Sequence, residues 1–326
     1  MREVMAIVKD SVRRLAGSRS MRALGPSDAF VKQQPLVIHG DTLSFDTLPP
    51  ALLQDRVEVP REEWLQFDNV KMERSLDEYL RNDGFPIPTP SDREGYFGDR
   101  HYHYWLSGLK DYLSIKGALD QMGSPLGGGS VVLDLGCASG RALRHFACHE
   151  KGLELWGADI NIRHVEWVRR FLDPSIKVLP ATIVPHLPIE DNTCSLVYAF
   201  SVFTHIDELE LAWIAEIRRI LTRGGVAYLT VHSDNTWRAI ERARPLYENL
   251  LAMKEHIAEY RVTPELFQGP MPTERIVFRW RTSAIYNVNV FHAIDYIKKS
   301  WGRFLDIVEV VRDGHNYQDV VLLRKR

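Results

Sequence analysis

The chain has 326 residues, 45% of them hydrophobic and 26% charged, which is the composition of an ordinary globular protein long enough to bury a large core. Its 41 basic and 43 acidic residues give a formal net charge of -2, so nucleic acid is not an expected partner. The sequence shows no apolar run near the roughly 18 residues of a membrane span, no secretory leader and no metal-ligand spacing among its 3 cysteines. A reduced, cytoplasmic protein without a metal ion is therefore expected.

Residues 1–95 are expected to form an N-terminal extension. Its first 24 residues are basic, with apolar residues on one helical face, and predict an amphipathic helix. Such a helix can dock on an anionic membrane surface, but it is more often a packing arm. Frequent prolines between about residues 25 and 95 predict an irregular wrapping segment with a short helix near Arg74 to Arg81.

A helix rich in aromatic residues, from Tyr102 to Ile115, is predicted to lead into a strand that begins at Val131 and ends in Asp134. A turn of small residues follows this strand, at positions 136–140, and opens a further helix. This layout is typical of a first strand–helix unit that holds a nucleotide-like cofactor. A dinucleotide fingerprint would need glycine where the chain has Ala138 and Arg141, and the Gly-Lys-Ser/Thr of a phosphate loop is absent.

Strands and helices alternate over the next hundred residues. Strands are predicted within 155–161, at 176–180 and at 226–232, and residues 187–201 are predicted to be a loop followed by a strand. A helix is predicted from Leu211 to Leu221 that ends at Gly224-Gly225. The first of these strands ends in Asp159, 25 residues after Asp134, close to the interval at which an acid reaches ribose hydroxyls. This alternation predicts a largely parallel sheet covered by helices on both faces.

Residues 236–290 interrupt the alternation as an insertion. Helix is predicted from Trp237 to Tyr260 with a break at Pro245, and a hairpin over 275–290. Insertions at this point rise above the carboxyl ends of the strands, so a subset of its large aromatic side chains is expected to face the cleft beside His232. The insertion is interpreted as a substrate lid or as a homodimer contact, and the sequence leaves both open. Beyond it, strands at 304–311 and 317–323, joined by a turn at 314–316, predict an antiparallel end to the sheet.

The order of Asp134, Gly136, Gly140 and Asp159, followed by Gly224-Gly225 and a strand, resembles the class I S-adenosylmethionine (SAM) dependent methyltransferases. The string Phe203-Thr204-His205-Ile206-Asp207 resembles the bacterial small-molecule and glycan-tailoring type of these enzymes. Ala138 stands where the usual motif has a third glycine. The resemblance implies an α/β, Rossmann-like fold with a mostly parallel seven-stranded sheet and an antiparallel last strand. It also implies that residues 96–326 form the SAM-binding domain.

The resemblance further implies how SAM is held. The small-residue turn would approach the methionine part, Asp134 would accept from its amino group, and Asp159 would accept from the ribose hydroxyls. No acid follows the third strand, so the adenine contact falls to Thr182 or to backbone. Arg100 and Tyr104 could touch the SAM carboxylate, although plain packing is the commoner role. The expected cofactor-binding residues are Asp134, Gly136, Cys137, Ala138, Ser139, Gly140, Asp159, Ile160, Thr182, Phe200 and Ser201.

The residues that follow the fourth strand indicate which class of molecule accepts the methyl group. These residues lack both the Asn/Asp-Pro-Pro-Tyr/Phe and the Pro-Cys signatures of nucleic-acid methyltransferases, and they include His205. This histidine is the candidate general base for a hydroxyl nucleophile, with a cap or packing role as the alternative. The predicted function is O-methylation of a small molecule or saccharide. N-, C- or carboxyl-methylation and a non-catalytic SAM-binding partner protein are the alternatives, and the intact Gly136, Gly140 and Asp159 argue against the last.

Overall fold

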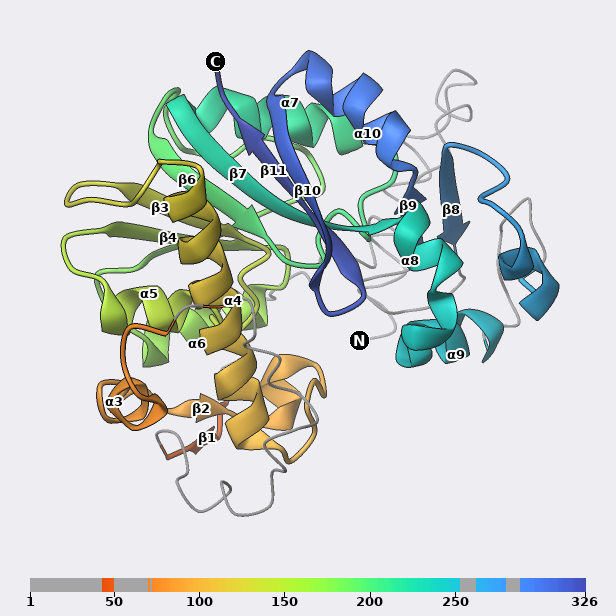
Figure 1. Cartoon of the computed structure of the whole chain (residues 1–326). Coiled ribbons are helices and arrows are strands. Elements are labelled where there is room, and N and C mark those ends of the chain that lie inside the picture. The colour runs from red at the N-terminus through yellow and green to blue at the C-terminus, as the bar shows by residue number, and fades with distance from the viewer. Residues whose placement is uncertain (1–42, 50–69, 71, 253–261, 280–287) are drawn as a thin grey trace, which may run out of the picture.

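The computed structural model describes residues 43–49, 70, 72–252, 262–279 and 288–326. Within these residues a central sheet has the strand order β10-β11-β7-β6-β3-β4-β5 (Figure 1). Its strands are β3 (Val131–Leu135), β4 (Glu154–Asp159), β5 (Lys177–Pro180), β6 (Cys194–Ala199), β7 (Leu221–Ser233), β10 (Asp306–His315) and β11 (Gln318–Arg324). Only β11 runs against its neighbours, β7 and β10, so the expected parallel sheet with an antiparallel last strand is confirmed.

Helices cover both faces of this sheet. On one face, α4 and α5 share an apolar core with the inner side of α6, and on the other α7 packs with α10 and η6. These elements are α4 (His101–Gln121), α5 (Leu143–His149), α6 (Ile162–Phe171), α7 (Glu210–Ile220), α10 (Ile294–Ser300) and η6 (Trp301–Arg303). Strand order reverses at β3, which lies between β4 and β6, and the carboxyl ends of these strands therefore border the crevice where such sheets bind ligands.

The prediction that Gly224-Gly225 ends the helix is wrong. Helix α7 ends at Ile220, and the two glycines lie inside β7, where the register with β6 shifts. Gly224 has a φ of 80°, and a Cβ on Gly225 would lie 3.0 Å from the carbonyl oxygen of Cys194. The glycines therefore serve a bulge in a strand rather than a helix end.

The N-terminal segment, residues 72–100, packs against α4 and α5. It holds α3 (Leu76–Arg81), the strand β2 (Ile87–Pro88), which pairs with β1 (Thr47–Leu48), and η3 (Pro90–Arg93). Ser75 and Glu78 form a capping box that starts α3. The amphipathic helix predicted over residues 1–24 lies outside the described residues.

The insertion has a small apolar core of its own. Its elements are α8 (Asp234–Arg238), η4 (Ile240–Arg242), α9 (Arg244–Ala252), η5 (Pro264–Gln268), β8 (Arg275–Arg279) and β9 (Val288–His292). Strands β8 and β9 pair as the expected hairpin, and β9 continues beside the end of β7. Trp237, Phe267 and Phe278 are buried in the local core, Tyr247 packs against it, and none of the four lines the cavity described below. The other large aromatic residues of the insertion, Tyr260, Trp280 and Tyr286, lie outside the described residues, so the expectation that a subset faces the cleft stays a prediction.

Candidate active site

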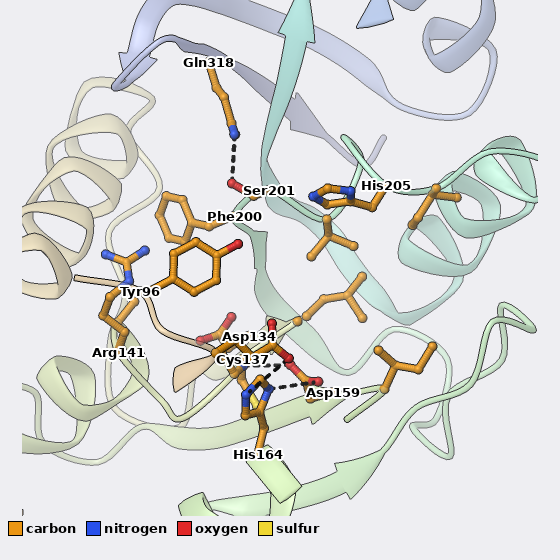
Figure 2. A pocket seen from close by; sticks show the side chains of 18 of the residues that line it. Tyr96, Asp134, Cys137, Arg141, Asp159, His164, Phe200, Ser201, His205 and Gln318 are labelled. Atoms are coloured by element: carbon orange, nitrogen blue, oxygen red, sulfur yellow. Dashed lines mark hydrogen bonds and ion pairs between the residues drawn. The ribbon is translucent and has the colours of Figure 1, made fainter. Parts of the chain in front are cut away.

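A cavity of about 1510 Å³ lies at the carboxyl ends of β3, β4 and β6. Single-ligand sites usually occupy about 300–1000 Å³, so this cavity has room for a cofactor and an acceptor together. Every cofactor-binding residue expected from the sequence lines it except Gly140, and so does His205 (Figure 2). Arg100 does not line the cavity, whereas Tyr104 does.

Two glycines of the small-residue turn, Gly136 and Gly140, are required by its backbone conformation and by close packing around it. Gly136 and Gly140 have φ values of 80° and 74°, a region that favours glycine. A Cβ on Gly136 would lie 2.3 Å from Val202 Cγ2, and one on Gly140 would lie 2.4 Å from Leu172 Cδ1. A side chain at either position would thus disturb packing, and Gly136→Val is expected to destabilise the fold. Ala138 also has a positive φ, of 45°.

Asp159 ends β4, and its buried carboxylate is held by neighbouring backbone. Oδ2 accepts from the Ala138 amide at 2.8 Å, and Oδ1 accepts from the Asn161 amide at 2.7 Å. His164 in α6, which the sequence reasoning missed, places Nδ1 3.4 Å from Oδ1 and Nε2 3.6 Å from Glu94 Oε1. Burial lowers the pKa of His164, but the hydrogen bond and the nearby carboxylates outweigh burial and leave this pKa raised.

Asp134 lies one strand away, near the end of β3, and is 3% exposed. Burial raises the pKa of its carboxyl group to about 8, although the positive charge of Arg141 opposes the shift. A buried carboxyl group with a raised pKa attracts a cationic group that would stabilise its ionised form. Asp134 is therefore suited to accept from an ammonium group inside the cavity.

A partly buried charged cluster forms another wall, and the sequence alone did not indicate it. Arg141, directly after the small-residue turn, places Nη1 2.5 Å from Asp111 Oδ2 in α4. His315, from the β10–β11 turn, places Nδ1 3.0 Å from Asp111 Oδ1, and its ring lies 4.7 Å from that of Phe200. These residues are far apart in the sequence and carry no shared motif, so only the fold brings them together.

The adenine end of the expected site is less polar. Thr182, which follows β5, lines the cavity, and its hydroxyl accepts from the Val184 amide at 3.1 Å. Ile160 lines the same end. Both residues therefore line the same cavity as the small-residue turn, and the Thr182 hydroxyl is already part of a local turn.

His205 lies at the opposite end of the cavity, beyond β6 (Figure 2). Its Nδ1 is 2.7 Å from the carbonyl oxygen of Val288 in β9. Nearby, the hydroxyl of Ser201 lies 2.8 Å from Nε2 of Gln318, which points into the cavity from β11. His232, the second histidine expected beside the acceptor, is buried and does not line the cavity, because Gln318 and Phe291 pack against it.

The donor set fits SAM. Two buried carboxylates stand at the ends of adjacent strands, suited to the hydroxyl and ammonium donors of SAM, and the small-residue turn lies between them. Bound there, SAM supplies a methyl group activated on a sulfonium. The described residues hold no group of three or more His, Cys, Asp or Glu side chains that could bind a metal ion.

Comparisons with known proteins agree with this site. Residues 133–229 match the family described as a methyltransferase domain. The sterol 24-C-methyltransferase of Schizosaccharomyces pombe is 34% identical over 128 residues, which cover 37% of this chain and 33% of that enzyme. The match therefore spans about a third of the length of the curated relative.

Solved structures of low identity also resemble the chain. A SAM-dependent methyltransferase from Mesorhizobium loti is 15% identical, with 66% of this chain and 100% of that one covered and a TM-score of 0.43. One from Methanosarcina mazei is 17% identical, with coverages of 61% and 94% and a TM-score of 0.41. Because these values are low, the identification rests on the sequence match and on the site.

The fold and the site define a Rossmann-like α/β enzyme that binds a nucleoside cofactor at the switch point of its sheet. Residues 133–229 carry a methyltransferase domain, and SAM is the cofactor that this domain and the cavity fit. Among the described residues, no helix is long and apolar enough to cross a membrane.

Proposed function

We propose that the enzyme transfers the methyl group of SAM to a hydroxyl group of a small molecule or saccharide, with His205 as general base. The carrying observation is the contact between His205 Nδ1 and the Val288 carbonyl. A carbonyl oxygen only accepts hydrogen bonds, so Nδ1 carries the proton and Nε2 is the accepting nitrogen of the ring. Burial lowers the pKa of His205, which keeps the imidazole neutral near pH 7.

A neutral imidazole is what a hydroxyl acceptor needs. In the proposed step the acceptor oxygen forms a bond to the methyl carbon, the carbon–sulfur bond breaks, and the hydroxyl proton passes to His205 Nε2. The products are a methyl ether and S-adenosylhomocysteine. A carboxylate acceptor would need no base, so the histidine favours the hydroxyl.

The insertion supports this function as a lid rather than as a dimer contact. It contributes Pro245, Arg279 and Val288 to the cavity wall near His205. The Val288 contact also fixes the orientation of the imidazole. We therefore propose that the insertion covers the acceptor end of the cavity, while the homodimer stays an alternative role.

The test is a panel of hydroxyl, amine and carboxylate acceptors with SAM, in which release of S-adenosylhomocysteine is measured. Methylation of hydroxyl compounds is expected, and His205→Ala is expected to lower turnover about 10²- to 10⁴-fold with little change in SAM affinity. His186→Ala is the matched control, because His186 is exposed and does not line the cavity. Turnover with amines or carboxylates alone, or full turnover in His205→Ala, would contradict the proposal.

A further inference from the structure

Arg93, the last residue of η3, is a buried cation that forms no ion pair in the described part of the chain, although the charge of Asp99 acts on it. Its side chain is 2% exposed and lines the cavity. Nη2 donates to the Gly98 carbonyl and lies 2.8 Å from His101 Nδ1. Nε and Nη1 have no hydrogen-bond partner, and no ion pair joins Arg93 to a carboxylate in the described part of the chain.

This arrangement is unfavourable without an anion. Buried N–H groups are rarely left unpaired, and a buried charge normally has a partner of opposite sign. Burial also lowers the pKa of the Arg93 guanidinium, which indicates that its charged form is poorly stabilised by the protein alone. An anionic group that entered the cavity beside Arg93 would gain a charge-assisted hydrogen bond.

Two sets of contacts connect Arg93 to the small-residue turn, one through the Tyr104 side chain and one through its neighbour Asp92. Its guanidinium is 4.8 Å from the centre of the Tyr104 ring, and the Tyr104 hydroxyl is 3.5 Å from the Ser139 carbonyl oxygen. The Ser139 hydroxyl in turn donates to the carbonyl of Asp92, the neighbour of Arg93. The turn is where the methionine part of SAM is expected, and the carboxylate is the anionic group of that part.

We propose that Arg93 binds the methionine carboxylate of SAM. The N-terminal segment would then supply a cofactor-binding residue that no motif in the sequence marks. The proposal rests on SAM as the cofactor and is independent of the proposed acceptor.

Two other arginines are weaker candidates for this role. Arg141 lines the cavity, but Asp111 already neutralises it. Arg100 precedes α4 and does not line the cavity. Arg93 combines burial, a place in the cavity wall and two unpaired donors.

The test compares SAM with decarboxylated SAM, which keeps the ammonium, sulfonium and adenosine groups but lacks the carboxylate. Isothermal titration calorimetry on the wild type is expected to show about 10- to 100-fold tighter binding of SAM. Arg93→Gln is expected to remove this preference by weakening SAM alone. Arg100→Gln is the matched control and is expected to keep the preference.

Three outcomes would overturn the proposal: no preference for SAM in the wild type, equal weakening of both ligands in Arg93→Gln, or loss of the preference in Arg100→Gln. Should Arg93→Gln fail to fold, Arg93→Lys keeps the charge and loses the planar fork, so a reduced but measurable preference is expected and an unchanged one contradicts the proposal. Neither ligand requires an acceptor, so a failure of the proposed O-methylation leaves these outcomes unaffected. A wild type that binds neither ligand would contradict the cofactor itself.

Discussion

The N-terminal segment and the insertion both border the cavity, but they are built in different ways. The segment has no core of its own, since its buried Tyr79, Leu80 and Ile87 belong to the same cluster as α4 and α5. The insertion buries Trp237 and its neighbours in a separate cluster. The wall at the cofactor end of the cavity is therefore held by the main core. Part of the wall at the acceptor end belongs to the insertion, which has its own apolar core.

The two regions are also anchored differently. Asp83 of the segment is bound by Arg144 in α5, with Nε 2.7 Å from Oδ2 and Nη2 2.8 Å from Oδ1, and both side chains are fully buried. The insertion is tied to α7 through Glu210, whose Oε2 accepts from Arg275 Nε at 2.7 Å and lies 3.1 Å from His292 Nε2 in β9. One anchor thus joins the segment to a cofactor-side helix, and the other joins the insertion to the opposite face of the sheet.

The largest expected effect follows from breaking the first anchor. Arg144→Met would leave the Asp83 carboxylate buried without its cation, and such changes cost about 3–5 kcal/mol of the free energy of unfolding. Because the segment carries Arg93 and Glu94 in the cavity wall, SAM affinity should fall as well. Chemical denaturation and a SAM titration measure the two effects.

Arg169→Ala provides the control for this prediction. Arg169 pairs with Glu166 on the exposed side of α6, where an ion pair contributes about 1 kcal/mol or less. A loss in Arg144→Met no larger than the loss in Arg169→Ala would show that the segment is not held by its buried pair.

A smaller effect on the whole domain is expected from a cavity in the insertion core. Trp237→Ala removes a fully buried ring, which typically costs about 3–5 kcal/mol, but here most of the loss should stay within the insertion. Hydrogen exchange should show faster opening of α8, α9 and β8, with SAM affinity unchanged. A clear loss of SAM affinity in Trp237→Ala would show that the cofactor end of the cavity depends on the insertion core, which would contradict this prediction.

The smallest effect concerns the pH dependence of SAM binding at the cofactor end. The folded pKa of Asp134 is raised to about 8, so the carboxyl group is mostly protonated below that pH. If its ionised form accepts from the ammonium of SAM, affinity should rise with pH, by up to tenfold per unit between about pH 5 and 7. Arg141, Asp159 and Asp111 also act on this carboxyl group, so the slope reports the whole cluster.

Calorimetric titrations across this range measure the slope, and Asp134→Asn should flatten it. The same raised pKa means that ionised Asp134 destabilises the ligand-free fold increasingly as pH rises from about 4 to 8. An affinity that stays constant with pH in the wild type would exclude Asp134 as the partner of the ammonium group.

Hydrophobic periodicity and turn residues correctly predicted elements whose structure depends on neighbouring residues in the sequence. The strand ending in Asp159, the small-residue turn and the hairpin of the insertion all appear where periodicity and turn residues indicated. The prediction failed at Gly224-Gly225, because glycine is used both at helix ends and in strand bulges, and only the pairing with β6 decides between them.

By itself the sequence determined the fold class, the cofactor and the strand ends that carry Asp134 and Asp159, because these depend on hydrophobic periodicity and on a turn whose backbone demands small residues. Tertiary structure decided which distant side chains meet at the cavity: Arg93 beside the small-residue turn, His315 beside Asp111, and the Val288 carbonyl on His205. Sequence periodicity carries no information on such contacts, since burial and charge pairing arise only when elements separated by tens of residues pack against the same sheet.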